Sequence, residues 1–305
     1  MSSFFDSTLA EWKEQIDGRL KAIIDGTDYP TEFKEVLDYA LFPGGKRLRP
    51  ILCLCWHELY APVDSYALDY ACGIEILHSY SLIHDDMPCM DNDEYRRGKL
   101  TVHAKYGEGK ALLAGDALLD LAYSILNKPT PRGAPSPFCL FSGFCGDRGL
   151  IHGQYIDLFE DIKTLDSLLE MYRKKTGALI SLACISGYLL GNNLDFNSAY
   201  NLVYALASNN NKMNGVDVSD DGRLVEYVMA TGFGDSFGCA FQIYDDLSEY
   251  ISGEPVVKTS VLNYIDLDEA KKLLNKNLND AARMFEVVDG DTRFLRELLE
   301  KFVIV

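Results

Sequence analysis

The side chains best suited to chemistry lie in the stretch from His78 to Lys105. A run of carboxylates there is followed directly by cations: Asp85, Asp86, Asp91, Asp93 and Glu94, then Arg96, Arg97 and Lys99. Carboxylates this close repel one another unless a cation neutralises them. Mg²⁺ takes a few carboxylates and completes its shell with water and phosphate oxygens, and each guanidinium can hold two such oxygens. The pattern indicates a site for magnesium and a diphosphate. The alternative is a solvated helix end with charges of both signs, and the adjacent Arg-Arg-Gly favours the first interpretation.

A second cationic stretch, FPGGKRLRP, occupies residues 42–50. Pro43 and two glycines should break a helix here, and Pro50 suits the first turn of the next one. The cations Lys46, Arg47 and Arg49 would then oppose the dipole of that helix, unless an anion sits among them. We therefore expect a phosphate-binding turn, with a solvated basic turn as the alternative.

Helical spacing extends over almost the whole chain and predicts an all-α fold. We expect helices over residues 4–25, 31–42 and 107–128, one beginning at Ser65 with Asp64 as its N-cap, and two near the C-terminus. A polar surface loop is expected at residues 208–222. Asp85 and Asp91 are six residues apart and would point away from each other on a regular helix. A bulge or kink near Pro88 could bring them together.

A second acidic helix is expected around GDSFGCAFQIYDDLSEY, residues 234–250. Phe237, Phe241, Asp245 and Glu249 are spaced by four, so one face is apolar and then acidic, which costs free energy without a cation. Two such helices facing each other could clamp metal ions on one diphosphate. The Phe237 face and an apolar stripe that includes Tyr80 would line a dry cavity below them. Upstream, Lys-Thr-Gly at residues 175–177 suggests a local unwinding or a bound anion; simple snorkelling of the lysine is the alternative.

Composition narrows the possible partners. The 305 residues could form one large domain or two, and a hydrophobic content of 48% allows a sizeable core. A net charge of −17 argues against nucleic acid or an anionic membrane surface as partner. No apolar run of membrane-spanning length is present, and the N-terminus lacks the pattern of a signal peptide. Eight cysteines without a C-x-x-C pair indicate a reduced, cytoplasmic protein whose thiols lie mostly in the core.

Five motifs in order resemble the trans-isoprenyl diphosphate synthases, or polyprenyl synthetases, most closely the bacterial farnesyl and geranylgeranyl diphosphate synthases. They are GGKRLRP, HDDMPCMDNDEYRRGK, AGDALL, KTG and FQIYDD. The resemblance covers nearly the whole chain. It implies one domain over residues 1–305, an all-α isoprenoid-synthase-type bundle around a central cavity with two facing Asp-rich helices, and a homodimer. It also implies Mg²⁺, three ions in all, as cofactor.

The activity implied is head-to-tail condensation of isopentenyl diphosphate with dimethylallyl and then geranyl diphosphate, giving farnesyl diphosphate. Alternatives are a geranylgeranyl diphosphate synthase, a weakly active or regulatory partner subunit, and a cyclase or head-to-head condensing enzyme on the same fold. Intact acidic and basic motifs argue against the last two. The sequence departs from the family pattern in three places. The second acidic motif, DDLSE, ends in Glu249 where the family commonly has an aspartate. The segment after this motif is short, and His152 replaces a glycine that is common in the family.

The resemblance also implies roles for individual residues. Asp85 and Asp91 would bind two Mg²⁺ with support from Asp86, and Asp245 would hold the third ion, with Asp246 and Glu249 completing the second acidic motif. Isopentenyl diphosphate would be held by Lys46, Arg49, His78 and Arg97, and the allylic diphosphate by Arg96. Lys175, Thr176 and Gln242 would lie near the forming allylic cation, and Lys258 is a further phosphate-binding candidate. Tyr80, with Ser81, would form the floor that limits product length.

Overall fold

The computed structural model describes residues 4–42, 44–129, 136–192, 212–213, 216–217, 222–253, 259–286 and 288–304. Lys258 and most of the predicted loop at residues 208–222 lie outside these ranges. Contacts divide the chain into two compact units, Met1–Leu54 with Val63–Pro131, and Cys55–Pro62 with Arg132–Val305. The assignment of the whole chain to a single domain stays a prediction.

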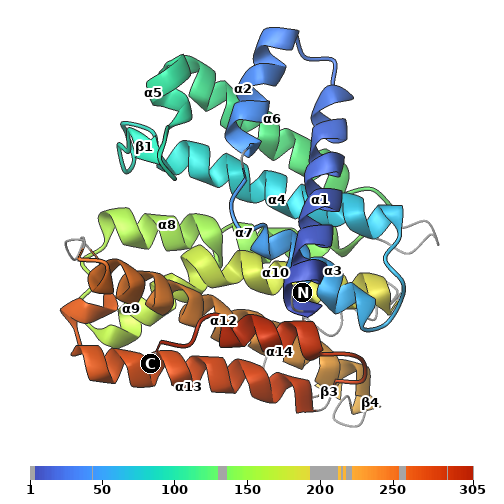
Figure 1. Cartoon of the computed structure of the whole chain (residues 1–305), viewed down its shortest axis with the longest axis vertical. Coiled ribbons are helices and arrows are strands. Elements are labelled where there is room, and N and C mark those ends of the chain that lie inside the picture. The colour runs from blue at the N-terminus through green and yellow to red at the C-terminus, as the bar shows by residue number, and fades with distance from the viewer. Residues whose placement is uncertain are drawn as a thin grey trace. The chain divides into compact units, whose positions relative to one another are not determined.

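The first unit is built around α4 (Ser65–Asp85), which is buried along most of its length. Its helices and strands are α1 (Phe4–Asp25), α2 (Thr31–Leu41), the start of α3 (Leu48–Glu58), α4, β1 (Tyr95–Arg96), β2 (Lys99–Leu100), α5 (Val102–Tyr106) and α6 (Glu108–Leu126). Helices α4 and α6 run side by side (Figure 1). Glycines allow this close packing, because a Cβ at Gly73 would lie 2.8 Å from Leu126, and one at Gly115 would overlap the ring of His84.

The second unit contains the other acidic helix, α12 (Gly222–Ile251). The remaining elements are η1 (Pro137–Leu140), α7 (Phe141–Cys145), α8 (Leu150–Phe159), α9 (Leu165–Tyr172), the π-helical turn η2 (Arg173–Gly177), α10 (Ala178–Gly191), β3 (Lys212–Met213), β4 (Val216–Asp217), η4 (Val261–Asn263), α13 (Leu267–Arg283), η5 (Met284–Glu286) and α14 (Arg293–Glu300). Helix α12 packs along both α10 and α13.

The predicted all-α fold is confirmed, and so are most helix positions. Asp64 caps α4, since its side chain accepts a 2.8 Å hydrogen bond from the backbone N–H of Ala67. Cysteines expected in the core, such as Cys53, Cys72 and Cys239, are buried. Within the described residues, none of the helices has the length and apolar character needed to span a bilayer.

Two short hairpins were not expected from the sequence. Strands of two residues are too short to show apolar–polar alternation. The β1–β2 turn has positive φ at both central residues, 52° at Arg97 and 74° at Gly98, as a two-residue type I′ turn requires. This hairpin places the Arg-Arg-Gly motif at a tight tip, so it decides where the two arginines lie.

We expected the helix face that carries Phe237 to line a cavity, and this prediction is wrong for Phe237 itself. Its ring is fully buried, stacks on Phe233 at 5.4 Å between centroids and meets Phe302 edge-on at 5.2 Å. Phe241 also contacts Phe302, at 5.5 Å. Periodicity marked this face as apolar, but a packed core and a cavity wall carry the same apolar pattern.

Candidate active site

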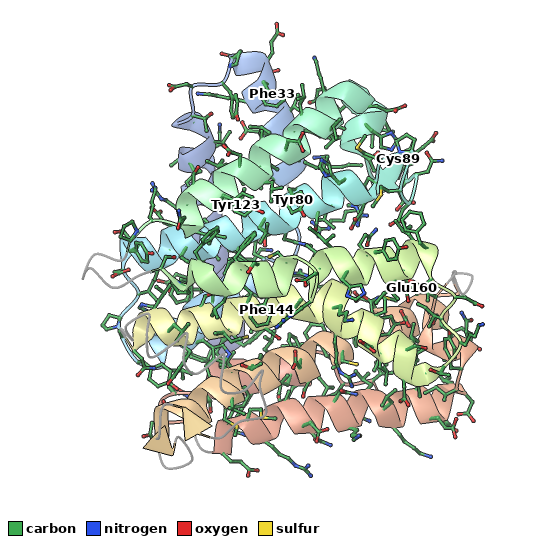
Figure 2. The ribbon with its side chains drawn as sticks, turned by 180° about the vertical axis from the view of Figure 1, so that it is seen from behind. Phe33, Tyr80, Cys89, Tyr123, Phe144 and Glu160 are labelled. Carbon is green, nitrogen blue, oxygen red and sulfur yellow. The ribbon has the colours of Figure 1, made fainter. Side chains whose placement is uncertain are left out.

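The first acidic motif folds back on the end of α4. After the helix ends at Asp85, the backbone N–H of Asp91 donates to the Asp85 carbonyl oxygen at 2.9 Å, and that of Asp93 donates to Asp86 at 3.2 Å. Asn92 takes a left-handed conformation, φ 57°, which asparagine tolerates better than most residues. The predicted interruption near Pro88 is therefore confirmed, and it brings Asp91 beside Asp85. Figure 2 labels Cys89 in this loop.

Asp86 is engaged by the adjacent arginine. Nε of Arg96 donates to Oδ1 of Asp86 at 2.7 Å, and the Arg96 Nη2 lies 2.5 Å from the same oxygen. Burial raises the pKa of Asp86, and the hydrogen bond from Arg96 opposes that rise. Asp86 thus fixes the position of Arg96, whereas Asp85 is only half-buried and Asp91 is exposed. The supporting role of Asp86 beside two metal ligands stays a prediction.

The β1–β2 hairpin is anchored at its base by polar contacts. The hydroxyl of Thr101 donates to the Asp93 carbonyl at 2.8 Å, and Tyr39 donates from α2 to the Leu100 carbonyl at 2.8 Å. Lys99 donates to the carbonyl of Phe42 at 2.8 Å and lies over the Tyr39 ring. These bonds tie the hairpin to the loop that follows α2, so the two basic motifs of the sequence meet in space.

Two glycines make that meeting possible. A Cβ at Gly45 would lie 2.6 Å from the guanidinium of Arg97, and one at Gly44 would overlap that of Arg47. Arg47 has φ 52° and is almost fully buried. It donates to Asp17, Glu75 and the Leu41 carbonyl at 2.8, 2.8 and 2.7 Å. Arg47 therefore holds the loop in place, while the loop presents its other cations.

The result is a cluster of cations around His78. Nη1 of Arg49 lies 3.3 Å from Nε2 of His78. Burial lowers the pKa of His78 well below 6.5, helped by Arg49, Arg97, Arg96 and Arg47. Burial also lowers the pKa of Arg97, and repulsion from Arg96 and Arg47 adds to this. A neutral imidazole among guanidinium groups that repel one another is the electrostatic setting into which a multiply charged anion fits. Lys46, from the same loop, is exposed.

The predicted floor residues lie on the inner part of α4. Tyr80 is 8% exposed, and its ring meets that of His84 edge-on at 5.6 Å between centroids. Ser81 is 7% exposed and donates to the His78 carbonyl at 2.9 Å. Figure 2 labels Tyr80 on this helix. Tyr80 lies five residues before Asp85, so the two are about 7.5 Å apart along the helix axis.

In the second unit, the expected unwinding at Lys-Thr-Gly is confirmed as the π-helical turn η2. Lys175 donates from this turn to Oδ2 of Asp157 at 2.5 Å. The Thr176 hydroxyl donates to Oε1 of Gln242 on α12 at 3.0 Å. The structure thus brings Thr176 and Gln242 together, and it gives Lys175 a partner. A widened turn of this kind is frequent at functional sites, since it turns side chains off the regular helical line.

The acidic residues of α12 differ in their surroundings. Asp245 is half-buried and Glu249 is exposed. Asp246 is 8% exposed and accepts hydrogen bonds from the Tyr172 hydroxyl at 2.5 Å and from the backbone N–H of Val261 at 2.8 Å. Burial raises the pKa of Asp246, opposed by these donors. The assignment of all three as metal ligands stays a prediction, and the oxygens of Asp246 accept hydrogen bonds from within the protein.

Gln154 and Asp157, three residues apart on α8, are two polar residues for which the motifs of the sequence predict no role. Neither amide atom of Gln154 has a hydrogen-bond partner in the described part, although the side chain is only 8% exposed. Gly153, just before it, is needed for close packing, because a Cβ there would overlap the backbone of Lys175. His152 bonds to the Asp147 carbonyl at 2.7 Å through Nδ1, which lies 3.3 Å from Lys174. The signal in the sequence that could have pointed to these residues is the Gln-x-x-Asp spacing, which places both side chains on one side of a helix.

The carboxylates suit a hard cation that brings other ligands with it. Among the described residues, no three histidine, cysteine or acidic side chains gather closely enough to enclose a metal ion. Asp85 and Asp91 are, however, joined through their backbones, in the motif whose arginines belong to the cation cluster. Mg²⁺ prefers one or two carboxylates together with substrate phosphates and water. The donor set therefore fits magnesium bound together with a diphosphate.

Comparison with known proteins gives consistent matches. Residues 30–208 match the family model described as polyprenyl synthetase. A farnesyl diphosphate synthase of Geobacillus stearothermophilus is 31% identical over 96% of this chain and 95% of its own. A geranylgeranyl diphosphate synthase of Cyanophora paradoxa is 37% identical over 83% and 77%. Several other relatives match over about half of their own length. The solved structure of an FPP/GFPP synthase from Zymomonas mobilis, 27% identical, superposes with a TM-score of 0.78 over 98% of this chain and 99% of that one.

Proposed function

Because this chain belongs to the polyprenyl synthetase family, we propose that it is a short-chain prenyltransferase that makes farnesyl diphosphate. It would condense isopentenyl diphosphate with dimethylallyl diphosphate and then with geranyl diphosphate. The observation that carries the proposal is the cation cluster of Arg49, Arg96 and Arg97 around a neutral His78, directly beside the Asp85–Asp91 turn. Such a site is matched to an anionic diphosphate and its metal.

Substrate binding follows from the charges. Lys46, Arg49 and Arg97 would hold isopentenyl diphosphate, with His78 as a neutral partner that adds no further repulsion. Arg96, held by Asp86, would contact the allylic diphosphate. Asp85 and Asp91 would hold two Mg²⁺ and Asp245 a third, which would supply positive charge for the diphosphate that leaves. Lys175, Thr176 and Gln242 would lie near the carbon that becomes positive, where fixed dipoles can stabilise the developing charge.

Product length is where relatives of this chain differ. The named relatives include both a farnesyl and a geranylgeranyl diphosphate synthase. We infer the C15 product because the bulky Tyr80 lies on the inner part of α4, one and a half turns from Asp85, where a growing chain would meet it. Geranylgeranyl diphosphate is the alternative. A homodimer with a single prenyltransferase domain per chain completes the proposal.

One incubation tests the activity. Purified protein is mixed with Mg²⁺, isopentenyl diphosphate and, in separate reactions, dimethylallyl, geranyl or farnesyl diphosphate, and the dephosphorylated products are sized by chromatography. Farnesol from the first two primers is expected. A C20 product supports the alternative synthase, and a cyclic hydrocarbon contradicts both. Absence of turnover with every primer would point to a regulatory subunit.

A further inference from the structure

The neighbouring carboxylates Asp245 and Asp246 of α12 have different surroundings. Successive residues of an α-helix point about 100° apart, so the two cannot serve one site equally. Asp246 is the buried one, and each of its oxygens already has a donor. Oδ2 accepts from Tyr172 and from the backbone of Val261, and Oδ1 lies 3.5 Å from Nε2 of Gln242. A metal ion would have to displace these donors from a buried oxygen.

One oxygen of Asp246 orients the amide of Gln242. Because Nε2 of Gln242 faces Asp246, its Oε1 points the other way and accepts the Thr176 hydroxyl at 3.0 Å. An amide turned by 180° would present a donor to Thr176 and an oxygen to the carboxylate. Asp246 therefore selects the orientation in which Gln242 offers its carbonyl to Thr176.

The other oxygen of Asp246 holds the chain at residues 259–261. It binds the Val261 N–H directly, and the Tyr172 hydroxyl that binds it also lies 3.4 Å from the Thr259 carbonyl. The Thr259 side chain then donates to Oδ1 of Asp157 at 3.2 Å. The second oxygen of Asp157 receives the ammonium of Lys175. A path thus leads from Asp246 through the Val261 N–H, along the backbone to Thr259, and on through Asp157 to Lys175.

We propose that Asp246 is a positioning residue and not a magnesium ligand: with Tyr172 it holds residues 259–261 and Gln242, and through them it sets the places of Lys175 and Thr176. The idea rests on the proposed function insofar as Lys175 and Thr176 contact the allylic substrate. Its structural part, the path from Tyr172 to Lys175, can be tested without any turnover.

The first experiment uses Tyr172→Phe, which removes one hydroxyl and no possible metal ligand. Hydrogen exchange of the Val261 amide should speed up about fivefold, the cost of one lost hydrogen bond. Modification of Lys175 by an amine-reactive reagent should rise relative to Lys174, the internal standard, whose partner Glu170 is unaffected. Thr259→Val should raise the labelling of Lys175 while leaving the Val261 amide protected, because Thr259 acts after Val261 on the path.

The second experiment separates positioning from metal binding. Asp246→Asn and Asp245→Asn are compared by the Mg²⁺ concentration that gives half the maximal rate. Asp246→Asn should lower kcat and change this Mg²⁺ concentration by no more than about twofold. Asp245→Asn should raise the same Mg²⁺ concentration about tenfold. The double variant of Asp246→Asn with Tyr172→Phe should be no slower than the slower single variant, since both break one unit.

Two results would overturn the proposal. One is an equal rise of the Mg²⁺ requirement in Asp246→Asn and Asp245→Asn, which would make Asp246 a ligand. The other is unchanged exchange of Val261 and unchanged labelling of Lys175 in Tyr172→Phe. Should the protein form no prenyl product, the exchange and labelling results still decide whether the path exists, so the two failures are distinguishable.

Discussion

Asp91 donates its backbone N–H to the carbonyl oxygen of Asp85 at 2.9 Å. This bond closes a turn that reverses the chain after α4, and it brings together the backbones of two acidic residues that a continuous helix would separate. The same turn leads into the β1–β2 hairpin, which carries Arg96 back to Asp86. One local reversal thus positions both the metal ligands we propose and an arginine for the diphosphate.

Removing either carboxylate of this turn should weaken magnesium binding. Asp85→Asn or Asp91→Asn is expected to raise the Mg²⁺ concentration for half-maximal rate by about tenfold or more, because an anionic oxygen ligand is lost. The control is Asp93→Asn, whose exposed carboxylate lies 3.9 Å from Arg96. Rates measured over a magnesium titration check this. Unchanged titrations in both variants would contradict the metal assignment.

Shortening the proposed floor should lengthen the product. Tyr80→Ala removes a ring that is 8% exposed and is expected to shift the products from C15 to C20 or longer. Tyr70→Ala serves as the control, since it removes another buried ring, 1% exposed, about 22 Å along the helix axis from Asp85. Chromatography of the dephosphorylated products gives the answer. An unaltered C15 product from the Tyr80 variant would show that the floor lies elsewhere.

Gly44 should be intolerant of any side chain. Gly44→Ala would place a methyl group into the Arg47 guanidinium and leave Glu75 without its buried partner, so we expect a loss of about 3 kcal/mol in the free energy of unfolding. Gly109→Ala is the control: no atom of the described residues lies within 4 Å of a Cβ placed there, so we expect no loss of stability. Urea denaturation measures both. A Gly44 variant as stable as the parent would show that the loop can move aside.

His78 should make stability depend on pH. Its pKa is lowered in the folded protein, so below 6.5 the unfolded chain binds a proton that the folded protein refuses. This contribution therefore destabilises the fold progressively as the pH falls below 6.5 and is absent above it. His78→Gln should remove it, so that the variant loses less stability than the parent between pH 7 and pH 5. Urea midpoints at the two pH values test this, and parallel losses would argue against a neutral His78.

Gln154 is buried, and neither of its amide atoms has a hydrogen-bond partner among the residues that the structure describes. Gln154→Leu is expected to keep or raise the free energy of unfolding, by up to about 1 kcal/mol, because a desolvated amide is replaced by an apolar group of similar size. We expect kcat/KM for the allylic substrate to fall, since unpaired buried groups are retained at functional sites at the expense of stability. Urea denaturation and steady-state kinetics check the pair of effects. Lower stability with unchanged kinetics would mean the amide serves the fold.

Much of this protein follows from its sequence alone. Helical periodicity, the Asp64 cap and the breaks at residues 42–50 determine an all-α chain, because these signals depend only on near neighbours. The order of the acidic and basic motifs likewise indicates a magnesium–diphosphate chemistry and the family. The Lys-Thr-Gly motif even signalled the widened turn that η2 provides.

Only the tertiary structure distinguished residues of the same type that lie close together in the sequence but have different partners. Arg47 and Arg49 are two residues apart in one motif, yet Arg47 is buried on Asp17 and Glu75 while Arg49 faces His78. Asp245 and Asp246 are adjacent, yet one is enclosed by Tyr172 and Val261. Each distinction depends on partners 15 to 74 positions away or on the angle between neighbouring helix residues. Local sequence patterns carry no information about such partners, because burial and hydrogen bonding are set by where distant segments pack.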